Sequence, residues 1–268
     1  MGREVLGRDA GRRLFGEDPA GYDAARPGHA EQVYENLRDR CGLGAGSKVV
    51  EIGPGTGQAT RRLLELGAAP LVVLEPDPAL AAFLRGALGE RIEIRPTTLE
   101  AAELEGDFDL AAAASSFHWV DEDVGLARIR HALRAGGWVA LWWTAFGDAR
   151  RPDPFRHAVD PLMRELQRSP SQAKDDGPPF AHDGEARVAA LERAGFDSIE
   201  PRRFEWAHTW DTAGIRGLFA TFSPVRALAP DRRDALLEEI GRIADEEFGG
   251  RVTKPVVTGL YTARKPDR

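Results

Sequence analysis

The stretch VVEIGPGTGQAT, residues 49–60, decides the fold of this chain. Its apolar, β-branched start predicts a buried strand, and the periodicity that follows the glycines predicts a helix. Between the two stand Gly53, Gly55 and Gly57. Glycine is required where the backbone takes a positive φ angle or where a ligand approaches the main chain closely. A tight turn usually needs one glycine, so three at alternate positions favour a ligand-binding loop.

The alternation of strand and helix continues on both sides of this loop, from Lys48 to Trp143. Near-continuous apolar runs are typical of a parallel sheet that is covered on both faces. They predict strands at 48–52, 71–75, 92–95, 108–114 and 138–143, with helices at 58–67, 78–88 and 121–133. This order predicts an α/β fold with a doubly wound, mostly parallel, Rossmann-like sheet.

Composition and charge exclude several classes of protein. The chain has 268 residues and a formal net charge of -7, which disfavours nucleic acid as a partner. Cys41 is the only cysteine and the six histidines lack metal-binding spacing, so we expect neither disulfides nor a metal. No run of about 18 apolar residues is present, so we expect no membrane span and a cytoplasmic location. A small molecule is the expected partner, and the oligomeric state is not predicted.

The details of the glycine loop decide between ligands. A dinucleotide-binding fingerprint needs a third glycine at position 58, where this chain has Gln58, and no Gly-Lys-Ser/Thr triplet of a phosphate-binding loop follows. What remains is E-x-G-x-G-x-G, followed about 20 residues later by Glu75 at the end of the next strand. A carboxylate at that place is typical of ribose recognition.

Four segments carry a resemblance to a known family: VVEIGPGTG (49–57), LVVLEPD (71–77), FDLAAAASSFHW (108–119) and LRAGGWVALWW (133–143). In this order and spacing they resemble class I S-adenosylmethionine-dependent methyltransferases of the small-molecule type. The resemblance covers roughly 20–145, and more loosely the remainder, where GRVTKPVVTGLYTARK is similar to the family's closing strand. It implies S-adenosylmethionine as cofactor, S-adenosylhomocysteine as product, and methyl transfer to a small-molecule acceptor by in-line displacement.

The resemblance also implies a domain plan over 1–268. It comprises an N-terminal helical arm (1–46), a cofactor-binding core (47–144), two helical lid insertions that carry substrate residues (145–183 and 211–248), and a final strand with a tail (249–268). With further strands expected at 198–210 and 254–264, the sheet has seven strands.

Cofactor contacts follow from the same resemblance. The methionine tail is expected along Gly53, Gly55 and Gly57, its amino group at Glu51 directly or through water, and the ribose at Glu75 with the adjacent Pro76. Thr98, Leu99 and Glu100 are the adenine candidates; the family's usual acid is missing there, so packing of Leu99 on the base is an alternative to a hydrogen bond. Ser115 and Ser116 are expected to hydrogen-bond the cofactor. Tyr22 and Arg26, from GYDAARPGH, are also expected to contact it, with Arg26 toward the methionine carboxylate. The alternative for this N-terminal segment is a surface arm without a cofactor contact.

His118 and Trp119 are expected between cofactor and acceptor, because they follow the strand at 108–114. Lining of the site is the favoured role of His118, and a general base is the alternative. An apolar, lidded substrate pocket is expected from Trp206, Phe219 and Phe222 together with these two, unless the lid aromatics form only a core of their own.

The acceptor atom stays open among oxygen, carbon and nitrogen. No [Asp/Asn]-Pro-Pro-aromatic run follows the fourth strand, which disfavours DNA bases and glutamine side chains as acceptors. Two alternative functions remain, a nicotinamide-dependent Rossmann oxidoreductase and a non-catalytic S-adenosylmethionine-binding module.

Overall fold

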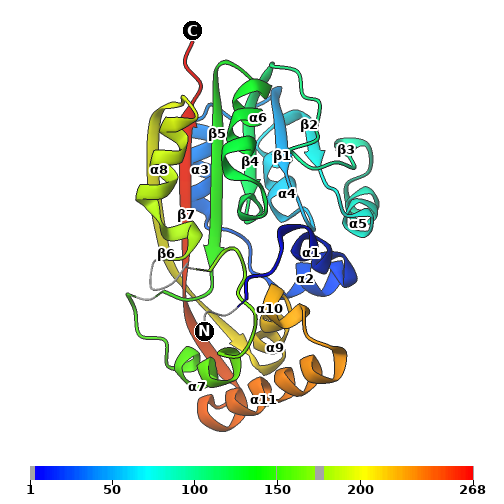
Figure 1. Ribbon diagram of the computed structural model, residues 1–268, viewed down its shortest axis with the longest axis vertical. Helices are drawn as coiled ribbons and strands as arrows, with labels where there is room; N and C mark the ends of the chain where they lie inside the picture. The colour runs from blue at the N-terminus through cyan, green and yellow to red at the C-terminus, as the bar shows by residue number, and fades with distance from the viewer. Residues whose placement is uncertain (1–3, 149, 173–177, 268) are drawn as a thin grey trace.

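A seven-stranded sheet organises the computed structural model, which describes residues 4–148, 150–172 and 178–267 (Figure 1). The strands are β1 (Ser47–Ile52), β2 (Ala68–Leu74), β3 (Glu93–Arg95), β4 (Phe108–Ala114), β5 (Leu133–Ala145), β6 (Asp197–Asp211) and β7 (Arg251–Arg264). Their order in the sheet is β3-β2-β1-β4-β5-β7-β6. The first five run parallel, and β7 is antiparallel to both of its neighbours. The predicted mostly parallel α/β fold is confirmed.

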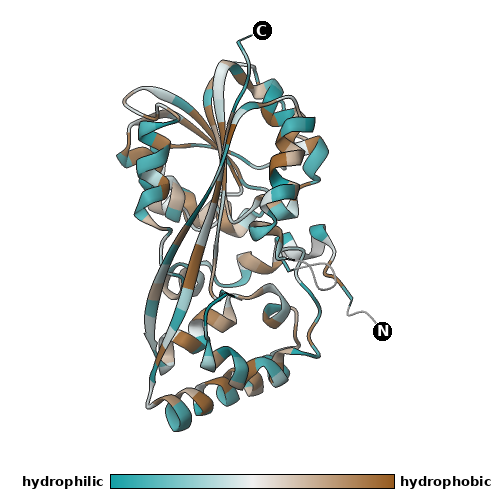
Figure 2. Cartoon of the chain, turned by 90° about the vertical axis from the view of Figure 1, so that its left-hand side faces the viewer, coloured by the Kyte–Doolittle hydropathy of each residue, from teal (hydrophilic) through white to brown (hydrophobic). Residues whose placement is uncertain are grey.

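Helices cover both faces of the sheet. One face carries α3 (Glu31–Asp39), α4 (Gln58–Glu65) and α5 (Pro78–Leu88), and the other carries α6 (Glu122–Ala132) and α8 (Gly184–Arg193). Alternation along β1 explains the two layers: Val49 packs with Leu63 of α4, whereas Val50 packs in the cluster that holds Ile129 of α6. Figure 2 shows the resulting pattern, with hydrophobic residues along the strands and hydrophilic residues on the outer helices.

The remaining helices gather at one end of the sheet (Figure 1). The N-terminal arm contains α1 (Arg8–Arg12), η1 (Arg13–Glu17) and α2 (Pro19–Ala25), and the lid contains α7 (Pro154–Met163), α9 (Thr212–Ala220), α10 (Ser223–Arg226) and α11 (Pro230–Phe248). Short 3-10 turns lie at η2 (Gly89–Arg91), η3 (Phe117–Trp119) and η4 (Phe180–His182). No helix among the described residues is long and apolar enough to cross a membrane.

Strands β5, β6 and β7 are longer than their sequence pattern predicts. β7 pairs with β5 as far as Ala145 and with β6 as far as Asp211, so the three strands extend past the parallel part of the sheet to the lid (Figure 1). The lid has its own hydrophobic core, in which Phe155 of α7 and Ile215 of α9 are almost completely buried. Gly136 lies inside β5 with φ +70°.

Candidate active site

A cavity of about 910 Å³ lies at the carboxyl ends of the parallel strands, between the N-terminal arm and the lid. The last residues of β1, β2, β4 and β5 line it. Of the residues that the sequence predicts for the site, the lining includes Tyr22, Arg26, Gly53, Gly55, Glu75, Pro76, Thr98, Leu99, Glu100, Ser115, Ser116, His118, Trp119, Phe219 and Phe222. The fold therefore brings together residues from segments that are up to 200 positions apart.

The three glycines of the loop differ in role, although all have positive φ angles. A Cβ atom on Gly53 would lie 2.7 Å from the Cβ of Ser116, so this glycine allows the β1 and β4 ends to approach. A Cβ on Gly55 would meet nothing within 4 Å, and Gly55 faces the cavity. Gly57 begins α4 as its left-handed cap and packs against Leu84, outside the cavity lining. Gly57 thus has a conformational role in the loop, and its cofactor contact stays a prediction.

Glu75 presents a buried carboxylate at the end of β2. Its Oε2 accepts a hydrogen bond from the Gly55 amide at 3.2 Å, and its Oε1 accepts one from the Asp77 amide at 2.9 Å. Burial raises the pKa of Glu75 to about 7, although these two bonds act in the opposite direction. Each oxygen keeps a further lone pair for a ligand. Asp77 caps α5 with its own side chain, so Glu75 is not needed as the helix cap.

Glu51 and Trp206 do not line the cavity. The Glu51 carboxylate is fully buried in β1, next to Thr60 of α4. Burial raises the pKa of the nearby Tyr34 of α3, and the charge of Glu51 acts in the same direction. Burial raises the pKa of Glu51 to about 7. Trp206 packs against the lid core and His208 instead. Because strand residues alternate between the two faces of a sheet, Glu51 lies on the same face as Val49, the one that α3 and α4 cover.

Thr98, Leu99 and Glu100 also line the cavity. Leu99 is only 2% exposed and belongs to the core of the sheet. Glu100 accepts a hydrogen bond from Arg12 of the N-terminal arm at 2.6 Å. The adenine contact proposed for this segment therefore consists of an apolar wall with one engaged carboxylate.

Gln58 ties the N-terminal arm to the glycine loop. Its Nε2 donates to the main-chain oxygens of Asp23 at 3.2 Å and Arg26 at 3.0 Å, and Arg61 forms an ion pair with Asp23 at 3.3 Å. The sequence marks Gln58 only as a departure from the dinucleotide fingerprint. In the fold, Gln58 holds the N-terminal arm in place, and the arm forms a second wall of the cavity.

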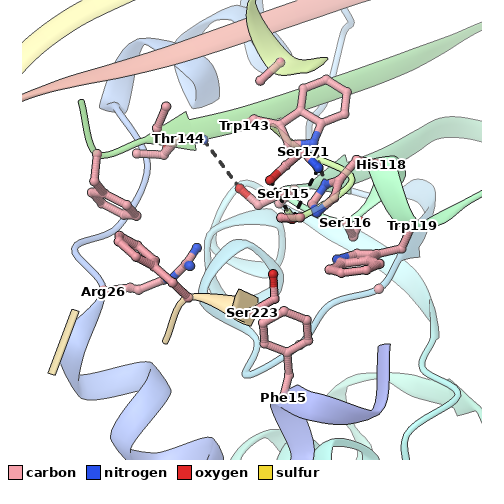
Figure 3. Close-up of a pocket in the computed structure, with 18 of the residues that line it drawn as sticks. Phe15, Arg26, Ser115, Ser116, His118, Trp119, Trp143, Thr144, Ser171 and Ser223 are labelled. Atoms are coloured by element: carbon pink, nitrogen blue, oxygen red, sulfur yellow. Dashed lines mark hydrogen bonds between the residues drawn. The ribbon is translucent and has the colours of Figure 1, made fainter. Parts of the chain in front are cut away.

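Arg26 reaches into the cavity from the arm (Figure 3). Its Nε donates to the Thr221 hydroxyl at 2.9 Å, and its guanidinium lies over the rings of Tyr22 at 4.7 Å and Phe146 at 5.3 Å. No carboxylate among the described residues pairs with Arg26. A guanidinium in this setting is suited to hold an anionic group of a ligand.

His118 stands beside Trp143 at the end of β4 (Figure 3). Its Nδ1 accepts a hydrogen bond from the Trp143 indole nitrogen at 3.1 Å. Burial lowers the pKa of His118 to about 3, and the charge of Arg26 acts in the same direction. Trp119 packs on the imidazole with ring centroids 4.9 Å apart, so both predicted residues face the cavity.

A second histidine, His29, lines the cavity and has no sequence signal. Its Nδ1 lies 2.8 Å from the Thr144 hydroxyl, which lies 3.0 Å from the Thr258 hydroxyl. Burial lowers the pKa of His29 to about 4, again with the help of Arg26. The position of His29 depends on how the arm packs against β5, which local sequence does not reveal.

The lid side of the cavity carries charges as well as the expected aromatics. Phe219 and Phe222 line it, while Asp148 forms an ion pair with Arg203 at 2.7 Å. Lys254 is buried and donates to Asp153 at 2.6 Å. This side thus combines the expected aromatic side chains with two ion pairs whose charges are matched within the protein. Residues 149 and 173–177 of the first insertion lie outside the described residues.

The cavity fits S-adenosylmethionine by its chemistry. Glu75 has free lone pairs for two ribose hydroxyls. The open space at Gly55 would let the methionine tail of the cofactor lie against the protein main chain, and Arg26 offers a cation for the carboxylate of that tail. The sheet also differs from the dinucleotide-binding order 3-2-1-4-5-6, because antiparallel β7 lies between β5 and β6.

Comparisons with known proteins agree with this geometry. A family model for a methyltransferase domain matches residues 50–139. An uncharacterized methyltransferase of Geobacillus sp. is 30% identical over 193 residues, which cover 62% of this chain and 83% of the relative. One from Mycobacterium tuberculosis is 30% identical over 129 residues, 48% of this chain and 51% of the relative. The chain thus spans about half the length of the mycobacterial relatives that it matches.

Among solved structures, the chain is similar to phosphoethanolamine N-methyltransferase 2 of Haemonchus contortus, in complex with phosphomonomethylethanolamine and S-adenosylhomocysteine. The TM-score is 0.58 at 15% identity, with 95% of this chain and 60% of the other covered, a likeness that concerns the fold. By its fold and its relatives, the chain belongs to the class I S-adenosylmethionine-dependent methyltransferases.

Proposed function

We propose that this protein transfers the methyl group of S-adenosylmethionine to a small-molecule acceptor by in-line displacement. The observation that carries the proposal is one cavity lined by a first set of residues, Glu75 and Gly55, and by a second set, His118, Trp119 and the lid residues Phe219 and Phe222. A cofactor held by the first set would present its methyl group toward the second.

The chain's own residues act mainly by alignment. When bound, the cofactor supplies an activated methyl group, so the protein has to hold the acceptor in line and exclude water. Proximity and orientation of this kind contribute on the order of 7–11 kcal/mol. The lid and arm enclose the cavity, which favours an acceptor of metabolite size.

Binding measurements test the proposal. Calorimetry is expected to give a dissociation constant of about 1 μM for S-adenosylhomocysteine, roughly -8 kcal/mol, and no binding of NAD. Binding of NAD without binding of S-adenosylhomocysteine would favour the oxidoreductase alternative. A screen of metabolites for a gain of one methyl group by mass would separate an enzyme from a binding module. The cytoplasmic location stays a prediction.

A further inference from the structure

One wall of the cavity, formed by His118, His29, Ser115 and Arg26, offers hydrogen-bond donors to a ligand. We infer that this wall, built around His118 and His29, binds a carboxylate, and that the acceptor is a carboxylic acid methylated on oxygen without a general base. The inference rests on the proposed function and names its substrate class.

His118 is fixed as a donor by its neighbour. An indole nitrogen can only donate, so the bond from Trp143 requires that Nδ1 of His118 be unprotonated. A neutral imidazole then carries its proton on Nε2. No described residue bonds to this nitrogen, and the nitrogen is not fully buried, so its N–H group is open to the cavity. His118 therefore presents an N–H group rather than a lone pair, which disfavours the general-base alternative.

The tautomer of His29 follows from its hydrogen-bond partners in the same way. If Thr258 donates to Thr144 and Thr144 donates to Nδ1 of His29, every proton in the chain has an acceptor. In the reverse direction the buried Thr258 hydroxyl would donate to nothing among the described residues, which is costly. His29 therefore also presents Nε2–H to the cavity.

Two further groups complete the donor set. Ser115 accepts a bond from the Thr144 amide at 3.4 Å, so its hydroxyl proton is available. Arg26 contributes a guanidinium without a carboxylate partner among the described residues, near enough to both histidines to lower their pKa values. Four donors with no opposing acid match the two oxygens and four lone pairs of a carboxylate.

The carboxylates that line the cavity are engaged elsewhere. Glu75 accepts two main-chain amides, Glu100 is bound to Arg12, and Asp148 is paired with Arg203. Asp160 lies 3.7 Å from Arg156 on the lid helix α7. With these four carboxylates engaged, the wall suits an acceptor that is already ionised at neutral pH.

The chemistry balances without a proton. One carboxylate oxygen forms a bond to the methyl carbon while the carbon–sulfur bond breaks and its electron pair stays on sulfur. The products are a methyl ester and S-adenosylhomocysteine, and no proton is taken up or released. His118 and His29 would hold the carboxylate in line; Trp143 and Thr144 are positioning residues, because they act through the two imidazoles.

Nitrogen NMR of histidine-labelled protein tests the donor assignment without any acceptor. In the S-adenosylhomocysteine complex we expect unprotonated Nδ1 and protonated Nε2 in both His118 and His29, identified by loss of signals in His118→Gln and His29→Gln. A Trp143→Phe variant is expected to admit the other tautomer of His118. An unprotonated Nε2 in either ring of the native chain would overturn the inference, while retained S-adenosylhomocysteine binding would leave the proposed function intact.

The carboxylate has two possible sources, the acceptor and the methionine tail of the cofactor. We expect phenylacetate, hexanoate and succinate to shift both Nε2–H signals in the S-adenosylhomocysteine complex, and phenylacetamide and 2-phenylethanol not to. A shift caused by S-adenosylhomocysteine itself but not by methylthioadenosine, which lacks the amino-acid tail, would assign the wall to the cofactor and overturn the acceptor assignment. No shift from any acid at saturating concentration would overturn it too.

Turnover gives the second readout. With tritiated methyl donor and the same compounds, label is expected in methyl esters that alkali cleaves to methanol; transfer to the alcohol or amide alone would overturn the inference. For an acid that is methylated, His118→Ala is expected to raise KM about 10- to 100-fold, and His118→Gln to restore it. The exposed His131 of α6 gives the control, since His131→Ala should change nothing. A fall in kcat alone that His118→Gln does not rescue would indicate a base and overturn the inference.

Discussion

The two sides of the cavity are built in different ways. The cofactor side comes mainly from one contiguous stretch, residues 52–76, in which strand, glycine loop, helix and strand follow one another, with 98–100 and Arg26 added to it. The acceptor side gathers single residues from the arm, from β4 and β5, and from the lid, such as His29 and Thr144, which are 115 positions apart. The spacing of residues within one contiguous stretch can be recognised in the sequence, whereas the acceptor side forms only when distant segments pack together.

Two buried carboxylates sharpen the contrast. Glu51 in β1 and Glu75 after β2 are both buried, and burial raises both pKa values to about 7. Only Glu75 reaches the cavity, because it stands one residue beyond the end of its strand, while Glu51 remains within the sheet. Equal burial therefore does not mean equal function.

The largest expected effect is that of Gly55→Val. A β-branched residue is strained at φ +58°, and its side chain would enter the space proposed for the methionine tail. S-adenosylhomocysteine affinity is expected to fall more than about 100-fold in calorimetry. Gly42→Val is the matched control, since Gly42 has φ +71°, open space at its Cβ, and no place in the cavity lining. Similar affinities of the two variants would argue against the loop as the cofactor site.

Glu75→Gln comes next, with an expected loss of about 1.5–3 kcal/mol in cofactor affinity, because an amide replaces one of the two acceptor oxygens. Calorimetry with S-adenosylhomocysteine measures it. Glu51→Gln, the matched buried carboxylate outside the cavity, should keep affinity within a few-fold. If both variants lose affinity equally, the distinction between the two carboxylates fails.

Glu51→Gln should instead change stability with pH. The pKa of Glu51 rises from 4.5 to about 7 on folding, so the folded state keeps this proton up to a higher pH than the unfolded state does. The native chain therefore loses stability as pH rises through this window. The free energy of unfolding of the variant, relative to that of the native chain, is expected to rise by on the order of 2 kcal/mol between about pH 5 and about pH 8. Urea unfolding of both proteins measures the gain, and a difference independent of pH would contradict it.

The smallest effect is expected at Gln58. Gln58→Ala removes two hydrogen bonds to the arm and should weaken cofactor binding by about 1 kcal/mol. Gln58→Gly completes the dinucleotide fingerprint but leaves the rest of the site unchanged. NAD is still expected not to bind to it in calorimetry. Measurable NAD affinity in that variant would mean that one side chain, rather than the whole fold, selects the cofactor.

Most of the sheet follows from local pattern. The helix at 78–88 and the strand at 108–114 have the predicted bounds, because Asp77 caps the helix and the apolar run of the strand is uninterrupted. The ends of β5 and the start of β7 could not be bounded in this way, whereas β6 extends the predicted strand 198–210 by one residue at each end. Their outer parts alternate with polar residues and are held by antiparallel pairing with each other beyond the parallel sheet.

The sequence by itself determined the family, the parallel core and the cofactor side of the cavity, because strand, turn and helix propensities act between neighbours along the chain. Only the tertiary structure decided which buried carboxylate faces the cavity, that Gln58 holds the arm, and that His29 joins His118. It also decided the direction of the hydrogen bond from Trp143 to His118. These properties depend on contacts between distant segments and on which face of a strand a side chain occupies, and the local sequence encodes neither.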